Sequence, residues 1–120
     1  MSTYPQAYLQ FVDHFNRQAY RACVEPLEVL WFAQRDDFHK ALIRLVVGLN
    51  QINLGLDSGP RFLLGTARTL LQPYHPTHNG LDLVALDGWI AAHEAQLGAG
   101  KQHAVPPLVL RLDPLPAADV

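Results

Sequence analysis

The feature that most constrains the fold is one long apolar stretch, DDFHKALIRLVVGLNQINLG, over residues 36–55. Its apolar side chains recur three and four positions apart, which places them on one face of an α-helix. That face consists of Phe38, Ala41, Leu42, Leu45, Val46, Leu49 and Ile52. Ile43 and Val47 add a second apolar strip, so polar residues keep only a narrow side. A helix that is apolar on most sides is a buried one, and this stretch is therefore predicted to be the central helix of a bundle.

The two ends of the predicted central helix carry suitable signals. Asp36 or Asp37 can cap the start, because a short carboxylate accepts hydrogen bonds from the free N–H groups of the first turn. Gly55 is a natural stop, because glycine readily adopts the left-handed conformation that follows many helices. A helix of this length spans roughly 30 Å, the width of a small domain. A charge at Leu45, in the middle of the apolar face, should be among the most damaging substitutions.

Four more helices are predicted around the central one. Each shows apolar residues at helical spacing, and they cover residues 3–17, 19–34, 60–71 and 81–97. Pro26 lies within the second of these, so we expect a kink there or a helix that begins near Val24. The sequence thus predicts an all-α fold: a single-domain bundle of about five helices.

The segments between and after these helices are predicted from turn residues and prolines. Asp57 or Ser58 can cap the helix predicted at 60–71, and Asp82 can cap the helix predicted at 81–97. Residues 72–80 are predicted to form an irregular loop. The bundle is expected to occupy residues 1–100. Residues 101–120 form a Pro-rich tail, in which PPLVLRL is expected to dock in an extended form and the last residues to fray.

Composition favours one globular domain and argues against nucleic-acid binding. Of the 120 residues, 49% are hydrophobic and 17% are charged, so the chain can bury a real core. The net charge is −2 and no Lys/Arg cluster exists, which is not the pattern of a nucleic-acid surface.

Cysteine usage and hydropathy predict a soluble cytoplasmic protein. Cys23 is the single cysteine, which fits a reducing compartment. It falls on an apolar helix face, so we expect a buried thiol with a raised pKa and no role as a nucleophile. The first residues lack the pattern of a signal peptide, and no apolar run approaches the roughly 20 residues that span a bilayer.

Three segments of the chain together have a familiar order and spacing. They are FNRQAYRACVEPLEVLW (15–31), the central stretch 36–55, and RFLLGTARTLL (61–71) followed by GLDLVAL (80–86). This pattern resembles the domain of unknown function 309 family, which consists of small helical proteins found widely in prokaryotes. The resemblance covers roughly residues 8–97. It implies a helical bundle. It implies no particular activity, because none is settled for the family.

The resemblance also implies a set of site positions. The family's second helix usually carries a His-Glu pair, a second Glu three residues later, and a Trp three further on. The two Glu and the Trp match here, but Val24 stands at the position of the His. Near the end of the central helix, Gln51 stands where the family often has another His, and Arg44 replaces a Gln common in the middle. The candidate signature cluster is Glu25, Glu28, Trp31, Arg44 and Gln51.

Glu25 and Glu28 are open to two interpretations. At a spacing of three they share a helix face, so they can ligate a divalent cation or divide acid and base roles. Alternatively they form ion pairs, either with Arg21 one turn earlier or with Arg44 on the central helix. The second interpretation is favoured, because a cation beside paired carboxylates replaces what a metal would do.

The histidines give weaker signals. His75 and His78 form an HxxH in the predicted loop, which makes them weak metal candidates, since zinc needs three or four ligands. His93-Glu94 lacks the second His of a zincin motif and is expected to lie on a solvated helix edge. His14 and His39 are expected at the surface or at a cap.

Two classes of function remain. The first is a non-catalytic domain that binds a protein partner or itself, because Phe32, Leu54, Leu56 and the tail exceed what the core can hold. The second is an enzyme or metal-dependent site on Glu25 and Glu28, degenerate in this chain. The missing imidazoles favour the first class, with no cofactor, no nucleic-acid partner and no membrane partner.

Overall fold

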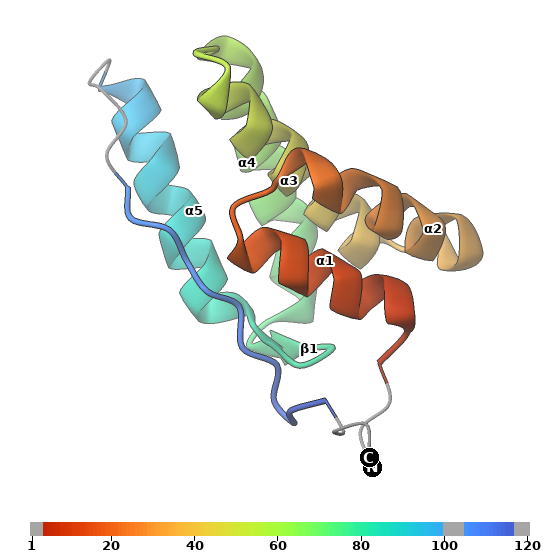
Figure 1. Ribbon diagram of the computed structural model, residues 1–120. Helices are drawn as coiled ribbons and strands as arrows, with labels where there is room; N and C mark the ends of the chain where they lie inside the picture. Colours follow the sequence, from red (N-terminus) through yellow and green to blue (C-terminus); the bar gives the residue numbers. More distant parts are fainter. Residues whose placement is uncertain (1–3, 100–104, 117–120) are drawn as a thin grey trace.

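The computed structural model describes residues 4–99 and 105–116, which fold into a bundle of five α-helices with one small hairpin (Figure 1). The predicted all-α bundle is thereby confirmed. The helices are α1 (Gln6–Asn16), α2 (Val24–Gln34), α3 (Asp37–Asn53), α4 (Ser58–Leu71) and α5 (Leu83–Gly98). Two short 3₁₀ turns accompany them, η1 (Arg21–Cys23) before α2 and η2 (Gln72–Tyr74) after α4.

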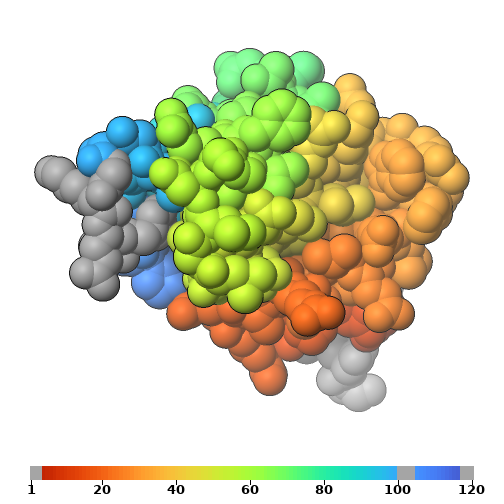
Figure 2. Space-filling view, turned by 90° about the horizontal axis from the view of Figure 1, so that it is seen from above, coloured from red at the N-terminus to blue at the C-terminus, as the bar shows by residue number. Residues whose placement is uncertain are grey.

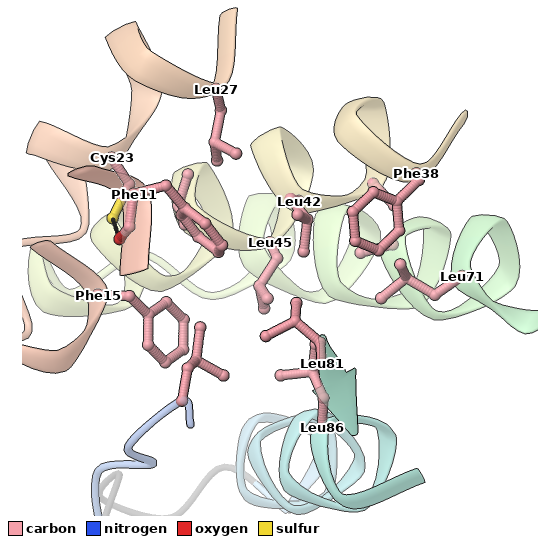
Figure 3. Packing of buried hydrophobic residues seen from close by; sticks show 14 of the residues in the cluster. Phe11, Phe15, Cys23, Leu27, Phe38, Leu42, Leu45, Leu71, Leu81 and Leu86 are labelled. Carbon is pink, nitrogen blue, oxygen red and sulfur yellow. Dashed lines mark hydrogen bonds between the residues drawn. The ribbon is translucent and has the colours of Figure 1, made fainter. Parts of the chain in front are cut away.

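The predicted central helix, α3, lies at the centre of the core. It packs against both α2 and α4, and Leu45 in its middle is completely buried. Figure 3 shows Leu42 and Leu45 pointing toward side chains from the surrounding elements. The buried residues of α3 are Phe38, His39, Ala41, Leu42, Leu45, Val46, Gly48 and Leu49.

Both predicted end signals of α3 are present. Asp36 caps the start, where its Oδ1 accepts a hydrogen bond of 2.9 Å from the backbone N–H of His39. At the other end Gly55 adopts a left-handed φ of 82°. Its N–H donates to the carbonyl of Ile52, and the N–H of Leu56 donates to the carbonyl of Gln51. These two bonds form a Schellman motif, which satisfies carbonyls that the helix end would leave unpaired.

The second predicted helix is shorter than expected and begins two residues before its proline. Residues 21–23 form η1, and α2 starts at Val24, so Pro26 lies in the first turn. A first turn does not need the N–H that proline lacks, and Pro26 is buried there. Of the two expected outcomes at Pro26, the structure has the later start.

The segment predicted as an irregular loop contains ordered elements. After η2, β1 (Thr77–His78) pairs antiparallel with β2 (Leu81–Asp82). Asn79 and Gly80 join the strands with positive φ values of 46° and 77°, as a tight type I′ hairpin turn requires. The hairpin takes residues 81–82 from the predicted fifth helix, so α5 begins at Leu83.

The caps predicted for the last two helices have different outcomes. The Asp82 carboxylate accepts from the backbone N–H of Ala85 at 3.0 Å, so this cap is confirmed. Asp57 occupies the cap position of α4 but makes no capping hydrogen bond with its side chain, and Ser58 is already the first helical residue.

The tail is extended and docked where the structure describes it. Residues 105–116 run along α5 and past the hairpin toward the N-terminal end of α1 (Figure 1). Leu110 and Leu112 are buried members of the core. The remainder of the predicted tail, at 101–104 and 117–120, lies outside the described residues, as does most of the segment that we expected to fray.

Candidate functional site

The signature positions from the sequence do not converge on one site. Glu25 and Glu28 are exposed on α2, and Trp31 is half-buried near its end. Arg44 and Gln51 are half-buried on α3. Gln51 is wedged against the start of α4, where a Cβ at Gly59 would collide with its Oε1.

The predicted ion bridge from Arg44 to the two glutamates is absent. Within residues 4–99 and 105–116, the ion pairs are Arg17–Asp13, His39–Asp36, Arg68–Asp87 and Arg68–Glu94. The reason is the orientation of α2, whose inward side is taken by Leu27 and Leu30, so that the glutamates face away from α3. The pair between Arg21 and Glu25 is also absent, because Arg21 belongs to η1 and the two residues do not share a continuous α-helix.

An ion cluster that the sequence did not suggest joins α4 to α5. Arg68 donates from Nε and one terminal nitrogen to the two Asp87 oxygens at 2.8 and 3.1 Å. Its other terminal nitrogen donates to Glu94 at 3.0 Å. These hydrogen bonds lower the pKa of Asp87, and His75 nearby adds to the effect. Asp87 and Glu94 are seven residues apart and thus share a helix face, which is the signal that could have found the cluster.

Three histidines pack against neighbouring side chains inside the fold. His39, predicted at the surface or at a cap, lies at the cap of α3 but is only 2% exposed, and His93, predicted on a solvated helix edge, is 6% exposed. The Nδ1 of His39 lies 2.7 Å from the capping Asp36 carboxylate, and His93 packs edge-on against Trp89. His78 of the HxxH pair packs against Phe38, with ring centroids 4.5 Å apart.

No group of three His, Cys, Asp or Glu side chains that could hold a metal ion occurs among the residues that the structure describes. The weak metal candidates from the sequence are the glutamate pair and the HxxH pair. The glutamate pair lies on α2, whereas His75 lies between η2 and β1 and His78 is the second residue of β1.

Cys23 is the buried thiol that the sequence predicted. It is completely buried, and its Sγ donates to the backbone carbonyl of Phe11 at 3.6 Å (Figure 3). Burial raises the pKa of Cys23 to about 12. A thiol with that pKa stays protonated at neutral pH and is a poor nucleophile.

The outward face of α2 is the most distinctive surface that the structure describes. We call it the outer α2 stripe; its residues are Glu25, Glu28, Val29, Phe32 and Arg35. Val29 and Phe32 are 57% and 58% exposed. The Arg35 guanidinium lies over the Trp31 and Phe32 rings, at 4.4 and 5.0 Å from their centroids. Figure 2 shows α2 (orange) at the edge of the molecule, with one side free of other elements in that view.

A groove runs beside this stripe, between α1 and α2. Its volume is about 1050 Å³, and Ala7, Leu9, Ala22, Pro26 and Val29 give it an apolar lining. Asp13, His14, Arg21 and Glu25 add polar groups along it. Because Val29 and Glu25 belong to both, the groove and the stripe form one continuous surface.

A second hollow of about 580 Å³ lies between the end of α3, α5 and the start of the tail. Tyr20 and Trp89 line it together with His93 and Asp57. The rest of its lining is partly aliphatic, from residues that include Leu49, Ile52 and Leu97.

None of the helices that the structure describes is long and apolar enough to cross a membrane.

Comparison with known proteins adds no assignment. No protein-family model, no curated protein and no solved structure matches this chain. The resemblance to the domain of unknown function 309 family therefore stays a prediction.

Proposed function

We propose that this protein is a non-catalytic helical domain that associates with a second copy of itself through the outer α2 stripe. The observation that carries the proposal is the pair of large exposed apolar side chains, Val29 and Phe32, on one face of one helix. Water contact with such side chains is unfavourable, and covering them releases free energy in proportion to the area buried. In this proposal the protein acts by assembly, and a reducing compartment such as the cytoplasm suits its single thiol.

The order of charges along the stripe favours a second copy over an unrelated partner. Glu25 and Glu28 lie in the N-terminal half of α2, and Arg35 follows its C-terminal end. When two such helices meet antiparallel, Arg35 of each copy lies opposite the glutamates of the other, and Phe32 lies opposite Val29. A two-fold interface needs this self-complementarity, since the same patch serves both partners.

The adjoining groove supplies contact area that a single helix face lacks. Stable interfaces bury about 800 Å² on each partner. This area is larger than the exposed face of one or two helical turns. The groove of about 1050 Å³ beside Val29 is open to side chains of the opposite copy. In particular, a Phe32 ring crossing the two-fold axis reaches the lining of Pro26 and Val29.

The decisive variant is Phe32→Ser, measured by light scattering over a range of protein concentrations. We expect a dimer for the parent chain and a monomer, or at least a tenfold weaker dimer, for the variant, because aromatic anchors dominate interface energies. Phe62→Ser is the matched control: Phe62 is 66% exposed on α4, outside the stripe, and its loss should leave the dimer unchanged.

A charge exchange tests the antiparallel arrangement. Glu28→Arg and Arg35→Glu should each weaken the dimer, because each places like charges opposite one another. The double variant restores opposite charges and should recover most of the affinity. A parent protein that stays monomeric at millimolar concentration contradicts the proposal, and so does a stoichiometric metal bound at Glu25 and Glu28.

A further inference from the structure

The described part of the tail contacts the bundle in the way that an extended peptide ligand contacts its receptor. Leu108, Leu110 and Leu112 alternate with outward residues, as side chains do in any extended segment. Leu110 and Leu112 are 8% and 4% exposed, whereas Val109 between the inward leucines is 65% exposed. Only alternate side chains therefore enter the surface beneath.

The side-chain amide of Asn16 on α1 binds both the carbonyl and the N–H of one tail residue, Leu110. Its Nδ2 donates to the carbonyl of Leu110 at 2.9 Å. Its Oδ1 accepts from the N–H of the same residue at 2.6 Å. One side-chain amide thus replaces the neighbouring strand that an extended segment would otherwise need.

The other polar contacts are also directed at the main chain of the tail. The Trp89 indole N–H donates to the carbonyl of Pro106 at 2.7 Å, and the Tyr4 hydroxyl donates to that of Pro114 at 2.7 Å. The N–H of Asp113 donates to the carbonyl of Gly80 at 3.0 Å. An aromatic donor facing a proline carbonyl is a common feature of Pro-rich peptide recognition.

We propose that this tail groove, formed by Tyr4, Asn16, Gly80 and Trp89, is a binding site for extended peptides. Residues 105–116 are its intramolecular occupant. The ligand is a segment of another protein with leucines at alternate positions between prolines, and it displaces the tail. Main-chain contacts accept any such segment, and the specificity comes from the leucine positions.

Two features favour exchange of the occupant. The tail follows the last helix, so it can leave without separating any pair of helices. It is also shallow, since most of its described residues are exposed. The groove lies along α1, α5 and the hairpin, whereas the outer α2 stripe is on a different part of the molecule (Figure 1), so the two proposals stand or fall separately.

The test uses the full-length chain and a labelled peptide, VPPLVLRLDPLP, which copies residues 105–116. A tail variant, Leu110→Ser with Leu112→Ser, weakens the resident segment while leaving the groove residues intact. Fluorescence anisotropy should show that this variant binds the peptide at least roughly tenfold more tightly than the parent, whose own tail competes at an effective concentration in the millimolar range. Equal affinity for both proteins, or no binding to a variant of parental helicity, overturns the proposal.

Two controls identify the contacts. A peptide with serine at both leucine positions should not bind. Asn16→Leu in the tail variant keeps the side-chain volume and removes the amide, and it should weaken peptide binding about tenfold if each of the two hydrogen bonds contributes as usual. Binding that ignores either change overturns the assignment of this groove.

A measurement on the parent chain covers the case in which the tail variant does not fold. Backbone N–H groups of Leu110 and Asp113 donate to the groove, so their hydrogen exchange should accelerate when unlabelled peptide is added and occupies the groove. Unchanged exchange at saturating peptide overturns the proposal. If mixed tagged copies of Phe32→Ser form dimers by exchanging tails, the occupant is a second copy, and the assignment to another protein is wrong.

Discussion

The end of α1 offers a sharp test of how the backbone is stabilised. Gln18 follows the helix with a left-handed φ of 60°. Its N–H donates to the carbonyl of Phe15, and the N–H of Ala19 donates to that of His14, both at 2.9 Å. This is the same Schellman motif that ends α3, but α3 uses Gly55 at the left-handed position. Replacing Gln18 by glycine should therefore stabilise the protein.

The magnitude follows from two opposing effects. A residue with a Cβ pays about 1–2 kcal/mol for the left-handed conformation. Glycine avoids that cost but loses about 0.5–1 kcal/mol more conformational freedom on folding. The net gain is about 0.5–1 kcal/mol, or a rise in melting temperature of about 2–4 °C for a domain of this size. The Gln18 side chain is exposed, so little packing is lost.

Thermal and urea unfolding, followed by circular dichroism, measure this gain. Gln10→Gly is the matched control, because Gln10 is exposed in the interior of α1. There glycine should destabilise by about 1 kcal/mol. The same substitution is thus expected to have opposite signs at two positions separated by eight residues. A Gln18→Gly protein that is less stable than the parent would refute the reasoning.

Two further predictions concern the core and the ion cluster. Leu45→Ala should lower the free energy of unfolding by about 3–4 kcal/mol, because the side chain is completely buried; Leu54→Ala, at a residue 69% exposed, should change it by less than about 0.5 kcal/mol in the same urea titration. Hydrogen bonds from Arg68 lower the pKa of Asp87 in the folded protein. The stability that this carboxylate contributes is therefore fully present above its unfolded-state pKa of about 4. It is lost as the pH falls through the lower pKa of the folded state. Asp87→Asn should therefore melt below the parent at pH 7, with the difference disappearing at strongly acidic pH, and a difference that persists there would contradict the charge-based explanation.

The helices could be predicted because their signals are local. The apolar face of residues 36–55 and the residues Asp36, Gly55 and Asp82 each act within a few positions of the chain. The hairpin was missed because its strands have two residues each, too few for an alternating pattern. The Asn79-Gly80 pair was its one usable signal, since this pair strongly favours a tight hairpin turn.

The left-handed Gln18 could not be predicted in the same way. Glutamine has no preference for that conformation, so nothing local marks the position. The helix-end hydrogen bonds and the direction in which the chain must turn toward η1 impose it.

The interhelical ion cluster has the predicted chemistry, one cation between two carboxylates, but it joins α4 to α5 and not α2 to α3. The sequence predicts that Arg44 is the cation that pairs with the two nearby carboxylates of Glu25 and Glu28. The structure satisfies the same chemistry with Arg68, Asp87 and Glu94. The difference is rotational: the inward side of α2 is apolar, so its acids face outward, whereas α4 and α5 meet along their polar edges. The outward acids of α2 are thus left without a cation in the described part of the chain, and the pairing with Arg35 of a second copy that we propose would supply one.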